Sequence, residues 1–125
     1  AELLNRTYPK SWGYIAENLV FPYDEKLGIH LEYEGYNGEI INQADVVLLQ
    51  YPLMWNMKEK VAKNDISYYQ KKTDSNGFFT GDTAYSIAWM DIGDYNKAEV
   101  EYKKNFIHVK GPYNVWNERF LYKLI

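Results

Sequence analysis

The sequence comprises 125 residues, which bounds it at a single domain, and its aromatic share of 18% is unusually high. The 14 basic and 17 acidic side chains give a formal net charge of −3, and without a dense Lys/Arg cluster this balance excludes nucleic acid as an expected partner. Because there is no cysteine, no metal-ligand spacing around the two histidines and no apolar run near the roughly 20 residues of a membrane span, we predict no disulfide, metal, other cofactor or membrane-spanning segment.

The N-terminal part of the sequence predicts a short helix followed by a strand-like segment. The helix is expected over Thr7–Asn18, where Thr7 can cap the first turn and Pro9 is tolerated within it. Phe21–Asp24 contains a proline and ends that helix. Ile29–Glu34 alternates apolar and polar residues, which is typical of a strand, and Asn37–Gly38 then predicts a turn.

From Asn42 onward the apolar spacing becomes helical. Apolar side chains recur at i, i+3, i+4 and i+7, at Ala44, Val47, Leu48 and Tyr51. Asn42 can cap this helix, Asp45 suits its first turn, and Pro52 ends it. A second helix is expected from about Met57 to Lys72.

Two further helices are predicted to form a hairpin in the C-terminal half. After a loop at Thr73–Gly77, a third helix starts near Thr80. Its apolar positions are Tyr85, Ala88, Trp89 and Ile92. Gly93 suits a left-handed C-cap and Asp94 the next N-cap, so the turn is very tight. The fourth helix is expected to bury one stripe, made of Tyr95, Ala98, Tyr102, Phe106 and Val109.

These elements predict an all-α fold of consecutive helical hairpins with one short strand-like excursion. The four tryptophans are many large rings for so few helices to cover, and the apolar ending Leu121–Ile125 carries no stop signal. We therefore expect the 125 residues to be a fragment of a larger helical domain.

Three blocks of the sequence, in their order and spacing, resemble glycoside hydrolase family 65, most closely its acid-trehalase-like branch. The first block is Asn42–Leu49 with Tyr51–Leu53, the second joins Asn64–Asp65, Tyr68–Tyr69, Thr73–Gly77 and Ser86–Trp89, and the third is Gly111–Glu118. The resemblance covers residues 16–118, most of the chain. That branch includes the glucosidase acting on glucosylgalactosyl-hydroxylysine of collagen.

The resemblance implies an (α/α)6 barrel, of which residues 1–125 would be a single segment from the later part of the catalytic domain. Another chain, or a region missing here, would have to complete that barrel. The family's hydrolases invert the anomeric centre with two carboxyl groups roughly 6.5–9.5 Å apart, one as general acid and one as general base. The chain alone is therefore not expected to be active.

The resemblance also implies roles for individual residues. Glu118 matches the Glu of the family's Val-Trp-x-Glu block and is the candidate general base, whereas the general acid has no counterpart in this chain. Gln43 and Asn42 match the start of a Lys-Gln-Ala-Asp pattern whose first two side chains hold the glucose being cleaved. Asn42 stands in place of the lysine. Asp82 is expected to be a helix-end or solvated carboxylate.

Two functions follow from these matches. The first is a fragment of an inverting hydrolase that cleaves an α-glucosidic bond in a glucosyl-containing saccharide, of the trehalose, kojibiose or glucosyl-galactosyl-hydroxylysine type; Gln43 and Glu118 favour it. The alternative is an inactive relative that serves as a carbohydrate-binding, storage or structural protein, which Asn42 favours. Phosphorolysis is less expected, because Thr73–Gly77 departs from the family's Ser-rich phosphate loop.

A glycosylation sequon, Asn5-Arg6-Thr7, makes Asn5 a candidate glycan site. Sequons of this kind are used in the secretory route, so the sequence slightly favours a secreted or lysosomal location over a cytoplasmic one without fixing the compartment.

Overall fold

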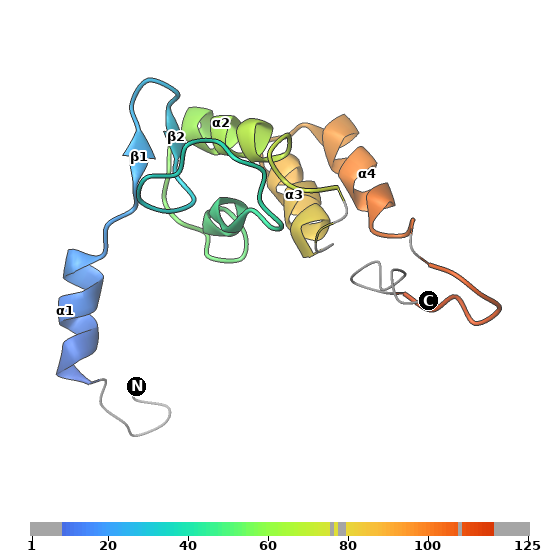
Figure 1. Cartoon of the computed structure of the whole chain (residues 1–125), viewed down its shortest axis with the longest axis horizontal. Helices are drawn as coiled ribbons and strands as arrows, with labels where there is room; N and C mark the ends of the chain where they lie inside the picture. The colour runs from blue at the N-terminus through green and yellow to red at the C-terminus, as the bar shows by residue number, and fades with distance from the viewer. Residues whose placement is uncertain (1–8, 76, 78–79, 108, 117–125) are drawn as a thin grey trace.

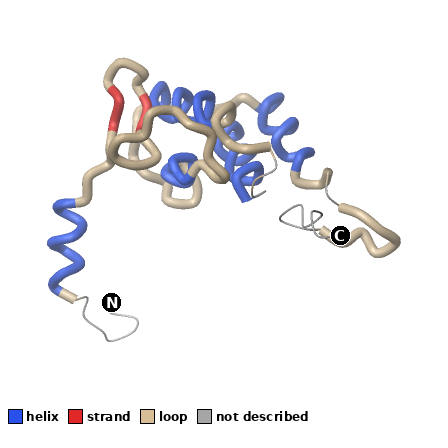
Figure 2. The backbone as a smooth tube through the Cα atoms, viewed as in Figure 1, coloured by secondary structure: helices blue, strands red, loops and turns tan. Residues whose placement is uncertain are grey.

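The computed structural model describes residues 9–75, 77, 80–107 and 109–116 (Figure 1). Its elements are α1 (Lys10–Asn18), β1 (Tyr23–Asp24), β2 (Ile29–His30), the 3₁₀ helix η2 (Asp45–Leu49), α2 (Glu59–Tyr69), α3 (Thr80–Asp91) and α4 (Tyr95–Lys104). The described part of the chain is therefore mostly helical with one two-stranded antiparallel sheet, as Figure 2 shows. This agrees with the predicted helical fold and its strand-like excursion.

The core lies where η2, α2 and α3 meet, and α4 packs along α3. The predicted apolar face of α3 is confirmed, because Tyr85, Ala88 and Trp89 are buried. The tight turn after α3 is confirmed as well. Gly93 adopts a left-handed φ of 83°, and the Asp94 side chain accepts a hydrogen bond from the backbone N–H of Lys97. These two residues fold α4 back against α3.

The helix predicted to start at Asn42 begins further along the chain than its apolar spacing indicates, and it is a 3₁₀ helix. Ile41 is held in an extended bridge to Thr73, and Ala44 keeps extended dihedral angles. The helix begins only at Asp45, as a five-residue 3₁₀ helix, so Asn42 does not cap it. The cap comes instead from Glu32, whose carboxylate accepts hydrogen bonds from the backbone N–H groups of Asp45 at 2.7 Å and Val46 at 3.2 Å.

The predicted apolar stripe of α4 is wrong in most of its members. Tyr95, Tyr102 and Phe106 are exposed, whereas the buried positions of this helix and its end are Ala98, Glu101 and Asn105. The buried face is polar because its groups find hydrogen-bond partners on α2 and α3, and burial of a polar group is tolerated when such partners exist.

The strand-like excursion is a two-residue pairing fastened to α2. Within the predicted segment Ile29–Glu34, only Ile29–His30 forms a strand, paired with β1. Asp65 of α2 is 3% exposed and accepts from the His30 backbone N–H at 2.8 Å and pairs with His30 Nδ1 at 2.8 Å. The Tyr69 hydroxyl donates to the His30 carbonyl at 2.9 Å. Two residues beyond this strand, the Glu32 carboxylate accepts hydrogen bonds from the start of η2.

The first helix stands apart from the core (Figure 1). It begins at Lys10 with Pro9 at the N-cap position, one residue before the helix and not within its first turn as predicted. The predicted cap Thr7 lies outside the described residues. No residue of α1 is buried, and its exposed apolar side chains include Trp12, Tyr14 and Ile15.

Candidate active site

The residue just before the first family-like block pairs through its backbone with the second block and with the residue that precedes its loop. Ile41 N–H donates to the Lys72 carbonyl at 2.9 Å, and Asp74 N–H donates to the Ile41 carbonyl at 2.8 Å. Gly77 approaches the same segment so closely that a Cβ there would lie 2.1 Å from the Asn42 carbonyl oxygen. Only glycine fits such an approach. The segment with Asn42 and the loop around Gly77 are therefore one structural unit.

The two candidate sugar-binding side chains lie on this unit, just before η2. Asn42 is exposed, and Gln43 is half-buried with its amide donating to Asp45 Oδ1 at 2.9 Å. Burial raises the pKa of Glu32, although its hydrogen bonds from the η2 backbone act in the opposite direction. The Glu32 carboxylate caps the start of η2, so the side chains of Asn42 and Gln43 do not cap this helix.

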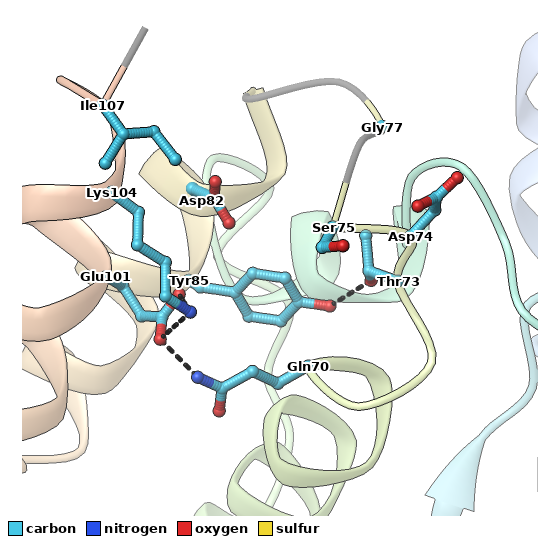
Figure 3. A pocket seen from close by; sticks show the side chains of 10 residues that line it. All are labelled: Gln70, Thr73, Asp74, Ser75, Gly77, Asp82, Tyr85, Glu101, Lys104 and Ile107. Carbon is cyan, nitrogen blue, oxygen red and sulfur yellow. Dashed lines mark hydrogen bonds and ion pairs between the residues drawn. The ribbon is translucent and has the colours of Figure 1, made fainter.

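A cavity of about 270 Å³ opens beside this unit, between the end of α2, the Thr73–Gly77 loop, the start of α3 and the end of α4 (Figure 3). Polar side chains contribute part of its lining. The Tyr85 hydroxyl shares a 3.0 Å hydrogen bond with Thr73 Oγ1, and burial raises the pKa of Tyr85, so this hydroxyl stays protonated. The cavity therefore carries hydroxyl, amide and carboxyl groups of the kind that hydrogen-bond to polyols.

Glu101 is the most buried charged residue that lines this cavity, with only 1% of the residue exposed. Its carboxylate accepts from Gln70 Nε2 at 2.5 Å, and Lys104 Nζ lies 2.8 Å from both carboxylate oxygens. These donors compensate the buried charge. Glu101 was not predicted from the sequence; the available signal was its i+3 spacing from Ala98 and to Lys104 on the same helix.

Asp82 lines the same cavity from the first turn of α3, so it is a helix-end carboxylate, one of the two expectations, and it is half-buried. Burial raises the pKa of its carboxyl, and the neighbouring Glu101 charge raises it further, while Lys104 partly opposes both. A carboxyl with these surroundings is less acidic than a solvated one.

We predict that Asp82→Asn stabilises the protein at neutral pH. Because the folded state raises the Asp82 pKa above its usual 3.8, ionisation costs more in the folded than in the unfolded protein. That penalty is absent below the unfolded pKa and develops as pH rises through the folded pKa. The gain in Tm of D82N over the wild type should therefore shrink toward acid pH, which thermal unfolding between about pH 3 and pH 8 would measure. A lower Tm for D82N at neutral pH would mean that attraction to Lys104 dominates.

The third block is fastened to the same end of the helices. Trp116 Nε1 donates to the backbone carbonyl of Asn105 at 2.8 Å, just beyond α4. The Asn105 side chain in turn accepts from Thr83 Oγ1 of α3 at 2.5 Å. Glu118 and Asn5 lie outside the described residues. Trp116 is thus attached at the end of α4, next to the part of that helix that lines the cavity.

Other kinds of site find no support in the part of the chain that the structure describes. No group of three or more His, Asp or Glu side chains there could hold a metal ion. No helix among the described residues is both long and apolar enough to cross a bilayer.

Comparison with known proteins shows what this chain is similar to. It is 39% identical over 108 residues to the protein-glucosylgalactosylhydroxylysine glucosidase of Dictyostelium discoideum, covering 86% of this chain and 15% of that protein. It is 35% identical over 117 residues to the Danio rerio protein of the same name, covering 93% and 18%. It is 37% identical over 115 residues to the periplasmic/secreted acid trehalase of Candida glabrata, covering 86% and 9%.

No protein-family model matches the sequence. The chain spans less than a fifth of the length of these curated relatives, between 9% and 18%. A kojibiose hydrolase of Mucilaginibacter mallensis also matches, at 28% identity over 78% of this chain. Across most of its length the chain thus belongs to the family of the protein-glucosylgalactosylhydroxylysine glucosidases, acid trehalases and kojibiose hydrolases, glycoside hydrolase family 65.

Proposed function

We propose that this chain is a segment of the catalytic (α/α)6 barrel of an inverting hydrolase that cleaves an α-glucosidic bond in a glucosyl-containing saccharide. The observation that carries the proposal is that the second and third family-like blocks both reach the end of α4, through the cavity-lining Thr73 and through Trp116. Ile41 is bridged to Thr73, and Trp116 is bonded to Asn105. Relatives named as glucosidases, trehalases and kojibiose hydrolases support the bond type.

In the proposed reaction, Gln43 and Asn42 hold hydroxyls of the glucosyl unit at the mouth of the site. Glu118 takes a proton from a water molecule whose oxygen attacks the anomeric carbon. The glycosidic C–O bond breaks on the opposite face, and a carboxylic acid supplied from outside this chain protonates the departing oxygen. The products are glucose with inverted anomeric configuration and the freed alcohol.

The rest of the barrel would be supplied by a region or chain that is not part of these residues. Large exposed apolar side chains support this, because a surface of this kind is normally covered. They gather on and after α1, with Trp12, Ile15 and Val20 each more than half exposed. The Tyr51–Trp55 loop adds a second group, in which Met54 is 82% exposed. The α3–α4 hairpin has the form of one repeat of such a barrel.

The proposal also includes glycosylation at Asn5 and a secretory or lysosomal route. The Asn5 sequon supports it, and the Candida glabrata relative is named as periplasmic or secreted.

The test is hydrolysis of kojibiose, trehalose and glucosyl-galactosyl-hydroxylysine by a protein that contains this chain within a complete catalytic domain. We expect cleavage of at least one of them, with NMR showing the β-anomer of glucose as the first product. The 14.8 kDa chain alone should be inactive, because it lacks the acid. An initial α-anomer would exclude the inverting mechanism. Binding of these sugars without hydrolysis would instead favour the inactive, carbohydrate-binding alternative.

A further inference from the structure

The backbone that carries Gln43 is held on both sides of this residue. Before it, Ile41 N–H donates at 2.9 Å to a backbone carbonyl just beyond the end of α2. After it, Ala44 is fully buried, and Asp45 N–H donates to Glu32 Oε1 at 2.7 Å. A binding group on a backbone that is already fixed needs less ordering when it meets a ligand. The remaining freedom of Gln43 therefore lies in its side chain.

The side-chain amide of Gln43 is oriented by the carboxylate two residues later. Gln43 Nε2 donates to Asp45 Oδ1 at 2.9 Å. A carboxylate can only accept hydrogen bonds, whereas an amide has one donating and one accepting end, so the donating end must face Asp45. Gln43 Oε1 receives no hydrogen bond within the described part of the chain. This oxygen is therefore left to accept from a ligand.

Asp45 is itself anchored by its backbone while its side chain stays at the surface. The Glu32 carboxylate accepts hydrogen bonds from the backbone N–H groups of Asp45, at 2.7 Å, and Val46, at 3.2 Å. Asp45 is exposed, and in the described residues its carboxylate has the Gln43 amide as its side-chain partner. An exposed carboxylate on a fixed backbone is a firm acceptor for that amide.

We propose that Asp45 is a positioning residue for substrate binding: its carboxylate holds the Gln43 amide so that Gln43 Oε1 accepts a hydrogen bond from a hydroxyl group of the glucosyl unit. This inference rests on the proposed sugar-binding role of Gln43. Asp45 acts through Gln43 and touches no reacting atom. Without the carboxylate the amide can turn over and present its donating end, which lowers the affinity for the sugar.

The first test measures the dissociation constant of glucose, the product common to all the proposed substrates, by isothermal titration calorimetry. The protein contains this chain within a complete catalytic domain, and the measurement does not depend on turnover. We expect Asp45→Ala to weaken glucose binding roughly 3–10-fold, the effect of one hydrogen bond that is no longer oriented. The matched control is Asp91→Ala, which removes an exposed carboxylate at the end of α3 and should keep the wild-type Kd.

A reciprocal exchange of the two groups separates positioning from a general effect on the fold. Gln43→Glu places two carboxylates side by side, and their repulsion should weaken glucose binding roughly 10-fold or more. Adding Asp45→Asn supplies an amide that donates to one oxygen of the new carboxylate, whose other oxygen still accepts from the sugar. We expect Q43E/D45N to return Kd to within about threefold of the wild type. A carboxylate that served only the start of η2 would give no such rescue.

The outcomes also separate this inference from the proposed function. If Gln43→Ala weakens glucose binding and D45A keeps the wild-type Kd, the positioning role is overturned and the sugar contact of Gln43 stands. Weaker binding by D45A without rescue in Q43E/D45N overturns the positioning role as well. If Q43A keeps the wild-type Kd, or if the wild type binds no glucose, the sugar contact and the positioning role both fail, whereas turnover of a disaccharide by the wild type would still support hydrolysis. Weaker binding by D45A, an unchanged D91A and rescue by the exchange support the inference.

Discussion

Glu118→Gln is expected to lower kcat by roughly 10²–10⁴-fold with little change in KM, because it removes the group that would accept the proton of the attacking water. Glutamine preserves the size and shape of the side chain but cannot act as a base near neutral pH. Substrate binding should persist, since it is assigned to Gln43 and Asn42. Steady-state kinetics on the best disaccharide substrate would measure both constants.

The matched control for this variant is Glu99→Gln. Glu99 is on α4 with its side chain 62% exposed, and it forms a surface ion pair with Lys103 at 2.6 Å. An exposed pair of this kind contributes little to stability, so E99Q should keep wild-type kinetics. If E118Q and E99Q have the same kcat as the wild type, another carboxylate must activate the water. An equal fall in both would point to a general effect of lost negative charge.

The sequence predicted helices best where the cause of the structure is local. Gly93 and Asp94 are neighbours, and the left-handed glycine and the capping aspartate act within one turn. The burial of Tyr85 and Trp89 likewise follows from spacing on one helix. Such features need no knowledge of the rest of the chain.

The start of η2 shows why local reading fails elsewhere. Asn42 has the chemistry of an N-cap, but the cap is Glu32, which lies 13 residues before Asp45. The bridge from Ile41 to Thr73 fixes the preceding backbone in an extended form and delays the helix. Both contacts depend on tertiary arrangement, which the spacing of apolar residues does not report.

The prediction of an apolar buried face on α4 was wrong for a related reason. Periodicity counted Tyr102 and Phe106 as core residues because their side chains are largely apolar. The helix instead buries Glu101, whose partner Gln70 lies 31 residues earlier on another helix. The burial of a carboxylate can be predicted only when the positions of its hydrogen-bond donors are known.

In the candidate site too, some residues could be predicted from the sequence and others depend on the tertiary structure. The resemblance gives Asn42, Gln43 and Glu118 as candidates from sequence alone, and the structure places the Asn42 backbone beside Gly77. It could not identify Trp116 as an anchor, since the bond to the Asn105 carbonyl uses a backbone acceptor that carries no sequence signal.

Trp89→Ala is expected to destabilise the protein by about 3–5 kcal/mol, the usual cost of truncating a large buried aromatic side chain. Trp89 is 1% exposed and heads the fully buried side chains in volume. Its ring also lies under Lys97, whose Nζ is 3.9 Å from the ring centroid. Alanine would leave a cavity between α3 and α4 and remove that cation–π contact. The midpoint of thermal unfolding should drop by roughly 10–20 °C.

Trp89→Phe should cost far less than Trp89→Ala for a reason specific to this site. The Trp89 Nε1 group is buried and has no hydrogen-bond partner among the described residues. An unsatisfied buried donor costs about 1–3 kcal/mol. Phenylalanine removes this donor, so part of the free energy lost with the smaller ring is recovered. Trp55→Ala serves as the comparison, since that ring is 48% exposed and contacts the Phe21 ring in a tilted arrangement, with the centroids 4.5 Å apart. If W55A lowers the midpoint as much as W89A, the stability lies in the Phe21–Trp55 contact and not in the α3–α4 core. Equal losses for W89F and W89A would show that the indole N–H has a partner that stabilises it.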